Sequence, residues 1–199
     1  YVRQADLVLL ATIVVGLAGL FAMNFNVVIP ALARDVLHTD AAGYGFLMAA
    51  SGIGALIAAL SIAFSGRARP ALIAGGALLL GVAEIGAAAV QAFPLALLAM
   101  GFMGFGAIAM AATANTVIQL AAPDELRGRV MSVYTTVFAG SAPIGGLLMG
   151  WIASRFGVDV SLAVGGAACA LLGLAAFWRL RRIRAIDVLR ERVAQGTAG

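Results

Sequence analysis

The sequence contains little charge. Only 11% of its 199 residues are charged, 63% are hydrophobic, and the mean hydropathy is +1.04. Soluble domains are about 25% charged and about 45–50% apolar. A soluble globule of this composition could not bury its apolar surface, which excludes soluble enzymes and nucleic-acid-binding proteins. The chain is therefore expected to be an integral membrane protein with no nucleic-acid partner.

Cysteine, histidine and lysine are also scarce. The single cysteine, Cys169, lies in an apolar run, which excludes a disulfide framework and a cysteine-based metal site. The single histidine, His38, excludes a histidine cluster, so no metal and no cofactor are expected. All 13 basic residues are arginine, which favours a GC-rich bacterial genome.

The position of the histidine also excludes one class of enzyme. A six-helix intramembrane protease of the rhomboid type needs a serine in a glycine-rich motif and a histidine in a later membrane helix. Ser141 follows Gly140, but His38 precedes both and lies between two apolar segments. We therefore expect no catalytic residues and no enzymatic activity.

The start of the chain is unusual. It begins with Tyr1, and no basic region or small-residue cleavage site leads into the first apolar run. This start predicts a fragment or a processed piece of a longer precursor.

Six apolar segments account for most of the chain. They are 19 to 28 residues long, and each is long enough to cross about 30 Å of hydrocarbon as a helix. Together they predict an all-α transmembrane domain over residues 1–178, a six-helix bundle, followed by a basic tail over 179–199. The predicted spans are 7–29, 43–64, 71–93, 95–122, 130–154 and 160–178.

The arginines predict the orientation of these spans. If both termini lie on one side of the membrane, that side receives eleven arginines and the other side receives only Arg34 and Arg155. Cytoplasmic loops carry an excess of arginine and lysine. We therefore expect a multi-pass protein of the bacterial cytoplasmic membrane with both termini in the cytoplasm.

The tail continues the arginine-rich pattern with an imperfect apolar stripe over 177–193. The simpler interpretation is a surface helix on anionic lipid headgroups. The alternative is a docking site for another domain or protein.

The chain matches itself at an offset of 91 residues. Asn24 falls on Asn115, residues 53–56 (Ile-Gly-Ala-Leu) fall on 144–147 (Ile-Gly-Gly-Leu), and Gly75 falls on Gly166. These matches predict two three-helix repeats, about 7–93 and 95–178. Because three is an odd number of spans, the second repeat must be inverted relative to the first. Inverted repeats are a recurring feature of secondary transporters.

Several stretches resemble the exporters of the major facilitator superfamily. Residues 24–30 (NFNVVIP) and 43–54 (GYGFLMAASGIG) resemble their seventh and eighth helices. Residues 123–134 (PDELRGRVMSVY) and 140–146 (GSAPIGG) resemble their tenth loop and eleventh helix. The most similar branch exports drugs and siderophores, and includes macrolide efflux and enterobactin export proteins. The resemblance implies that this chain is the C-terminal six-helix half of a twelve-helix transporter.

This resemblance also assigns a place to each span. Segments 7–29 and 95–122 would line the central cavity, 43–64 and 130–154 would face the other half, and 71–93 and 160–178 would be peripheral. The run 140–146 is similar to the antiporter signature of exporters, although that signature belongs to the fifth helix. The loop 65–69 keeps the arginines of the family's gating motif but lacks its acidic residue.

The implied function is that of half a secondary active exporter of amphipathic small molecules, working by alternating access, with proton coupling left open. Its expected partners are membrane lipids, a small-molecule substrate, and either the N-terminal six-helix half or a second six-helix chain, a homodimer included. The alternative is an accessory or structural membrane subunit with no transport activity of its own.

Amide, hydroxyl and aromatic side chains are the candidates for a substrate cavity. On 95–122, three of them follow each other at helical spacing and share one polar stripe. The alternative is that they form hydrogen bonds between helices, each worth under about 1–2 kcal/mol. The candidates are Phe21, Asn24, Asn115, Thr116, Gln119 and Tyr134.

Glu84 is the only ionisable carboxyl deep in a span. Because a charge there costs roughly 3 kcal/mol, the group should be protonated, paired or facing a wet cavity. It is a candidate for proton coupling or cation binding, and the alternative is a neutral acid bonded to a neighbouring helix. Three methionines, Met100, Met103 and Met110, offer either an adaptable ligand surface or plain packing.

A second group of residues suggests gating or helix bending. Arg127 and Arg129 follow two acidic residues in the loop before 130–154, as a gating salt bridge or as helix capping. A proline among glycines predicts a kink in that span. These residues are Gly140, Pro143, Gly145 and Gly146.

Overall fold

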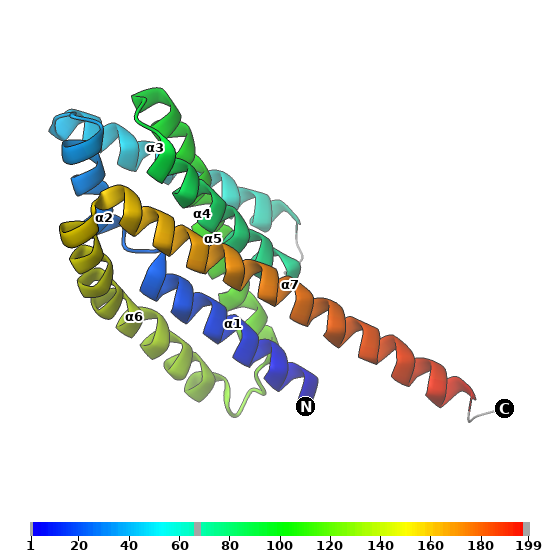
Figure 1. Ribbon diagram of the computed structural model, residues 1–199. Coiled ribbons are helices and arrows are strands. Elements are labelled where there is room, and N and C mark those ends of the chain that lie inside the picture. Colours follow the sequence, from blue (N-terminus) through cyan, green and yellow to red (C-terminus); the bar gives the residue numbers. More distant parts are fainter. Residues whose placement is uncertain (1, 66–68, 197–199) are drawn as a thin grey trace.

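The structure is a computed structural model that describes residues 2–65 and 69–196, all of whose regular elements are helices (Figure 1). Six stretches are long and apolar enough to span a membrane, which confirms the six predicted apolar segments and the all-α class. Arg67 of the predicted cytoplasmic loop and the side chains of the tail from residue 183 onward lie outside what the structure describes. The elements are α1 (Val2–Phe21), α2 (Phe25–Ala31), the π-helix η1 (Leu32–Val36), α3 (Ala41–Ser65), α4 (Ala71–Ala89), α5 (Phe93–Ala121), α6 (Arg127–Phe156) and α7 (Val158–Gly196).

The first predicted span is not one continuous helix. α1 ends at Phe21, α2 begins at Phe25, and the chain between them is not helical (Figure 1). The backbone N–H groups of Ala22 and Met23 both donate to the carbonyl of Ala18, which closes the end of α1. The Asn24 side chain then binds the carbonyl of Leu20, as asparagine does when it competes with the helix backbone. The span is therefore interrupted in the part where the sequence predicted an unbroken helix.

The other helices begin and end at recognisable signals. Pro70 precedes α4, and α5 carries a proline in its first turn, where a missing N–H costs nothing. Ala122 is extended because it precedes Pro123, and this ends α5. Gly157, with a φ of 101°, makes the short turn between α6 and α7 that few other residues could adopt.

α7 is longer than the last predicted span. Its 39 residues correspond to about 58 Å, so the segment after residue 178 continues the same helix and projects from the bundle (Figure 1). The guanidinium of Arg182 lies 3.5 Å from the centre of the Trp178 ring. Tryptophan and arginine gather at the membrane–water interface, which is where this helix would leave the hydrocarbon.

Glycines set the helix packing. Gly76 of α4 lies against the backbone of Gly106 and Met110 on α5, and Gly81 lies against Gly166 on α7. In each case a Cβ would collide with backbone atoms of the neighbouring helix. Small residues allow this close approach, which compensates for the weak hydrophobic drive between helices in lipid.

The helices differ in how far the bundle covers them. In the most apolar stretch of each helix, half of the residues of α4 are buried, against 22% for α3 and 17% for α6. The resemblance implied a peripheral place for 71–93, but within this bundle α4 is the most enclosed span, because it packs between α5 and α7. The low coverage of α3 and α6 is consistent with the implied contact between these helices and another half.

Candidate substrate cleft and the break in α1

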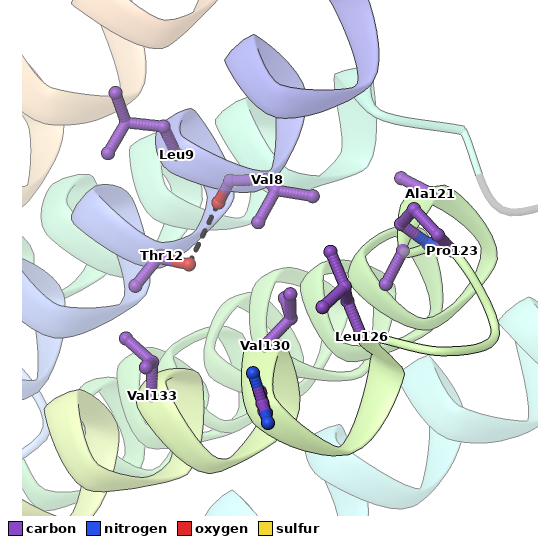
Figure 2. A pocket seen from close by; sticks show the side chains of 10 residues that line it. Val8, Leu9, Thr12, Ala121, Pro123, Leu126, Val130 and Val133 are labelled. Atoms are coloured by element: carbon purple, nitrogen blue, oxygen red, sulfur yellow. Dashed lines mark hydrogen bonds between the residues drawn. The ribbon is translucent and has the colours of Figure 1, made fainter. Parts of the chain in front are cut away.

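A cleft of about 450 Å³ lies where α1, the α5–α6 loop and the start of α6 meet (Figure 2). Its walls are almost entirely apolar. The hydroxyl of Thr12 donates to the carbonyl of Val8, 2.8 Å away, so it is already bonded within its own helix. The lining residues are Val8, Leu9, Thr12, Ala121, Ala122, Pro123, Leu126, Arg129, Val130 and Val133.

The cleft offers one charge to a ligand. Arg129, one of the predicted gating residues, contributes to its lining, and no carboxylate does so among the described residues. An apolar wall with a single polar edge suits a molecule with a large apolar part, which binds mainly by apolar contact. It is therefore the best candidate for a substrate site on this chain.

A second apolar hollow continues along the same two helices. Gly16 and Leu20 of α1 face Gly140 and Ser141 of α6 across it. Gly140, predicted to be a kink or gating residue, is exposed there. The surface between α1 and α6 is thus open and apolar over much of its length.

The predicted polar stripe on α5 is present at the end of that helix. Gln119 donates a hydrogen bond to the side chain of Asn115, and the hydroxyl of Thr116 donates to the carbonyl of Ala112. Arg127 donates to the carbonyl of Gln119 at 3.1 Å and pairs with Asp124. Arg127 therefore ties the start of α6 to the end of α5, which fits either capping or a gating bridge.

The two α1 candidates lie at the break and not in the cleft. Asn24 is buried and donates from its amide to the carbonyl of Leu20 at 2.9 Å. The same amide lies close to the positions that side chains would take at Gly145 and Gly146 of α6. Within the described residues, no hydrogen bond joins Asn24 or Phe21 to the Asn115 group. The predicted cavity set is thus divided between two places.

Tyr134 is not exposed to a cavity. Only 4% of it is accessible, and its ring stacks on Phe138 with the ring centres 6.2 Å apart. The predicted methionine surface is also internal, because Met100, Met103 and Met110 are fully buried. Packing is the role that their positions support.

Pro143 lies within the continuous helix α6, which follows a curved path in Figure 1. It is exposed, while Gly145 is buried against the backbone carbonyl of Leu20. The proline does not interrupt the helix, and the neighbouring glycine brings α6 close to the end of α1.

Glu84 is buried in α4, with only 3% of it accessible. Its Oε2 atom has no hydrogen-bond partner among the described residues. The carboxyl faces α7, where its Oε2 would lie 3.3 Å from a Cβ at Gly165. An ionised carboxylate left without a partner in apolar surroundings is costly, so this acid must be neutral or bind a cation.

Comparison with known proteins decides the family. The sequence profile of a family described as transmembrane secretion effectors, within the major facilitator superfamily, matches residues 1–195. The chain belongs to this family. Its six apolar helices make it a multi-pass membrane protein.

A multidrug efflux pump named Tap, from Mycolicibacterium fortuitum, is 30% identical to this chain over 172 residues. The match covers 85% of this chain and 41% of the pump, so the chain spans about two fifths of the length of that relative. No solved structure matches the sequence.

Two features of the structure were not predicted from the sequence. The cleft residues Val8, Leu9 and Thr12 lie on a face of α1 that no residue pattern distinguishes from a lipid-facing one. The break after Phe21 had a weak signal, because Asn24 and Pro30 both disfavour an undisturbed helix. Among the described residues, no group of three histidine, cysteine or acidic side chains could hold a metal ion.

Proposed function

We propose that this chain is half of a secondary exporter that moves amphipathic small molecules across the bacterial cytoplasmic membrane by alternating access. The observation that carries the proposal is the open apolar cleft between α1 and α6 (Figure 2). It lies on α6, which the bundle leaves largely uncovered. A cleft in such a place can be closed by a second wall and opened again when the wall moves.

The uncovered helices support a second six-helix unit. Leu147 of α6 is 78% exposed and Ile53 of α3 is 60% exposed, and both lie on the repeated motif of these helices. We infer that the N-terminal half of the same transporter, or another six-helix chain, covers these faces. A second copy of this chain is the remaining option, and it would pair the two faces with themselves.

The lining of the cleft supports an amphipathic substrate. Its surface is apolar except for Arg129 and the hydroxyl of Thr12, which is already bonded to Val8. Such a wall binds by shape and apolar contact, which tolerates different molecules. The similarity to a multidrug efflux pump supports the same substrate class, of the drug or siderophore kind.

The arginines support an exporter that loads from the cytoplasm. Arg127 and Arg129 lie at the end of α6 where the cleft is found, and α7 runs back to this end with Arg179, Arg181 and Arg182. The positive-inside rule places this end, and both termini, in the cytoplasm. The cleft then opens toward the compartment from which an exporter collects its substrate.

Transport through a defined complex tests this proposal. The protein would be purified from its host membrane in mild detergent, its composition measured by native mass spectrometry, and ethidium efflux measured after reconstitution. We expect a two-unit complex that exports ethidium. A lone chain, or a complex that moves no ethidium and no other amphipathic cation or anion, would contradict the proposal.

A matched pair of variants tests the cleft itself. Val133→Trp fills the cleft, while Leu171→Trp adds the same bulk to an exposed site on α7. We expect the first variant to lose most ethidium efflux and the second to keep it. Equal activities would show that substrate does not use the cleft.

A further inference from the structure

The break in α1 leaves the carbonyl of Phe21 without its helix partner. The carbonyl of Ala18 accepts from two backbone N–H groups, and the amide of Asn24 donates to those of Leu20 and, at 3.5 Å, Gly19. In a continuous helix the carbonyl of Phe21 would accept from Phe25. Here α1 has ended, and among the described residues the Phe21 carbonyl has no hydrogen-bond donor. It therefore lacks the hydrogen bond that a carbonyl inside a helix has.

The unpartnered carboxyl of Glu84 lies on the other side of the same small space. Both the Phe21 carbonyl oxygen and the Glu84 Oε2 atom lie within contact distance of the position that a Cβ would occupy on Gly165. Because Gly165 has no side chain, both oxygen atoms border the same small space. Two acceptors from different helices, α1 and α4, therefore line this space without a hydrogen to share.

We propose that Glu84 and the carbonyl of Phe21 form a proton-binding site, in which a proton held on Oε2 is donated to the carbonyl oxygen. A proton on Oε2 satisfies both oxygen atoms without any further ligand. Ca²⁺ and Mg²⁺ bind about six or more oxygen ligands. Here the third atom near the Cβ position of Gly165 is the methyl carbon of Met149, which cannot bind a metal. The space is thus lined for a hydrogen bond and not for a coordinated metal.

The surrounding helices bring few other ionisable groups to this site. α5 has no ionisable side chain, and the described one of α1, Asp6, lies near its opposite end. On α7, the buried thiol of Cys169 lies in the electrostatic field of Glu84 and donates to the carbonyl of Ala77 at 3.3 Å. Arg34 and Asp35 of η1, which packs on α7, are exposed and pair with each other. The proton on Glu84 therefore has no competing charged partner.

Protonation at this site controls the conformation of the break. The O–H···O bond takes the place of the helix bond that Phe21 lost, so it holds α1 in its broken form against α4 and α7. Loss of the proton leaves a carboxylate facing a carbonyl oxygen, and their repulsion favours a different arrangement of α1 and α2. The site thus gives the proposed exporter its coupling ion, and only this use of the site rests on the proposed function.

Infrared spectroscopy tests the site without any transport assay. The full chain in lipid nanodiscs at about pH 7 should have one protonated carboxyl band, because exposed aspartate and glutamate are ionised at that pH. We expect the band to be lost in Glu84→Gln and retained in Glu125→Gln, which removes an exposed acid. In Gly165→Ala, whose methyl would occupy the space, the band should shift to the higher frequency of an unbonded carboxyl.

Gly86→Ala is the control for added bulk, since no atom lies within 4 Å of a Cβ there and the residue is on the same helix as Glu84. Its band should be unchanged. Absence of the band in the unmodified chain would overturn the site, as would a band that Gly165→Ala leaves in place. A carboxylate band whose frequency shifts with added sodium or potassium ions until it saturates would show that the site binds a metal cation. That result would also overturn the proton site. If the band behaves as expected but ethidium is not exported, the site stands and the proposed function fails.

Discussion

α1 and α5 are the first helices of the two predicted three-helix repeats, and they have different forms. α1 is broken directly before Asn24, whereas α5 continues through Asn115 without interruption (Figure 1). Asn24 is buried and binds backbone carbonyls, while Asn115 is half-exposed and bonded to Gln119. The same residue type at matching positions thus closes the end of α1 but only bonds to another side chain on the surface of α5.

The contacts around the two helices explain this difference. α5 is held in its middle, where Gly101, Gly104 and Gly106 lie against the backbones of α3 and α4. α1 is approached most closely at its end, where Gly145 meets the carbonyl of Leu20 and Gly165 meets that of Phe21. Helices packed through their middles stay straight, and a helix packed at its last turn can end there. The comparison teaches that the two matching helices are packed at different points, α5 through its middle and α1 at its broken end.

A bulkier residue in the α3–α5 contact should have the largest effect on the free energy of unfolding. A Cβ at Gly54 would overlap the carbonyl of Gly101, so we expect Gly54→Val to lower the free energy of unfolding by about 3 kcal/mol. Gly52→Val, two residues away with open space around its Cβ, should change it little. Gly145→Val should cost less than Gly54→Val, because the end of α1 can shift. Denaturation in detergent measures all three, and equal losses at Gly54 and Gly145 would break the comparison.

The next largest effect is expected from removing the two matching asparagine side chains, whose losses of unfolding free energy should differ. Asn24→Ala leaves the carbonyls of Leu20 and Gly19 unpaired in a buried place, at a cost of about 2 kcal/mol in the free energy of unfolding. Asn115→Ala removes a half-exposed side chain and should stay within about 0.5 kcal/mol. Both values come from the same denaturation curves. A larger loss at Asn115 would show that the two asparagines have been assigned the wrong roles.

Replacing the buried acid should have a smaller effect. Glu84→Leu removes the proposed donor to the Phe21 carbonyl, so we expect the free energy of unfolding to fall by about 1 kcal/mol. Glu84→Gln keeps an N–H group that can donate to the same carbonyl and should lower it less. Thermal unfolding of both variants measures this difference. A Glu84→Leu protein more stable than the parent would mean that the carboxyl has no stabilising partner.

The smallest effect is expected in the loop that joins α5 to α6. Arg127 pairs with Asp124 at the surface, where the two side chains are 48% and 87% exposed. Such exposed pairs contribute about 0–1 kcal/mol, so Arg127→Ala should lower the free energy of unfolding by less than about 1 kcal/mol. A change in ethidium efflux without a change in stability would assign Arg127 to gating. A loss of several kcal/mol would contradict the view that α5 is held mainly by glycine packing in its middle.

The number and type of the elements could be predicted from the sequence because hydrocarbon thickness and apolar length are directly linked. The six spans 7–29 to 160–178 all correspond to described helices. The break at 22–24 could not be predicted, because it depends on how Gly145 and Gly165 of later helices meet the end of α1. Sequence pattern shows an asparagine, but not which carbonyl groups it will reach.

The candidate site was only partly accessible to sequence reasoning, for a similar reason. Glu84 was found because a carboxyl in a long apolar run is conspicuous, and Arg129 because it stands beside a predicted span. The apolar walls at Leu9 and Val133 were not found, because an apolar side chain facing a cleft looks like one facing lipid. Which face is open is a property of the packing and not of any single helix.

Hydrogen exchange of the two matching helix segments tests the central claim most directly. The chain would be reconstituted in lipid nanodiscs, and amide exchange would be followed by mass spectrometry in residues 22–25 of the α1 break and 113–116 of α5. We predict that the break exchanges faster by about tenfold or more, because the backbone N–H groups of Asn24 and Phe25 have no acceptor among the described residues. Equal protection of the two segments would contradict the account, since it would mean that α1 is as continuous as α5.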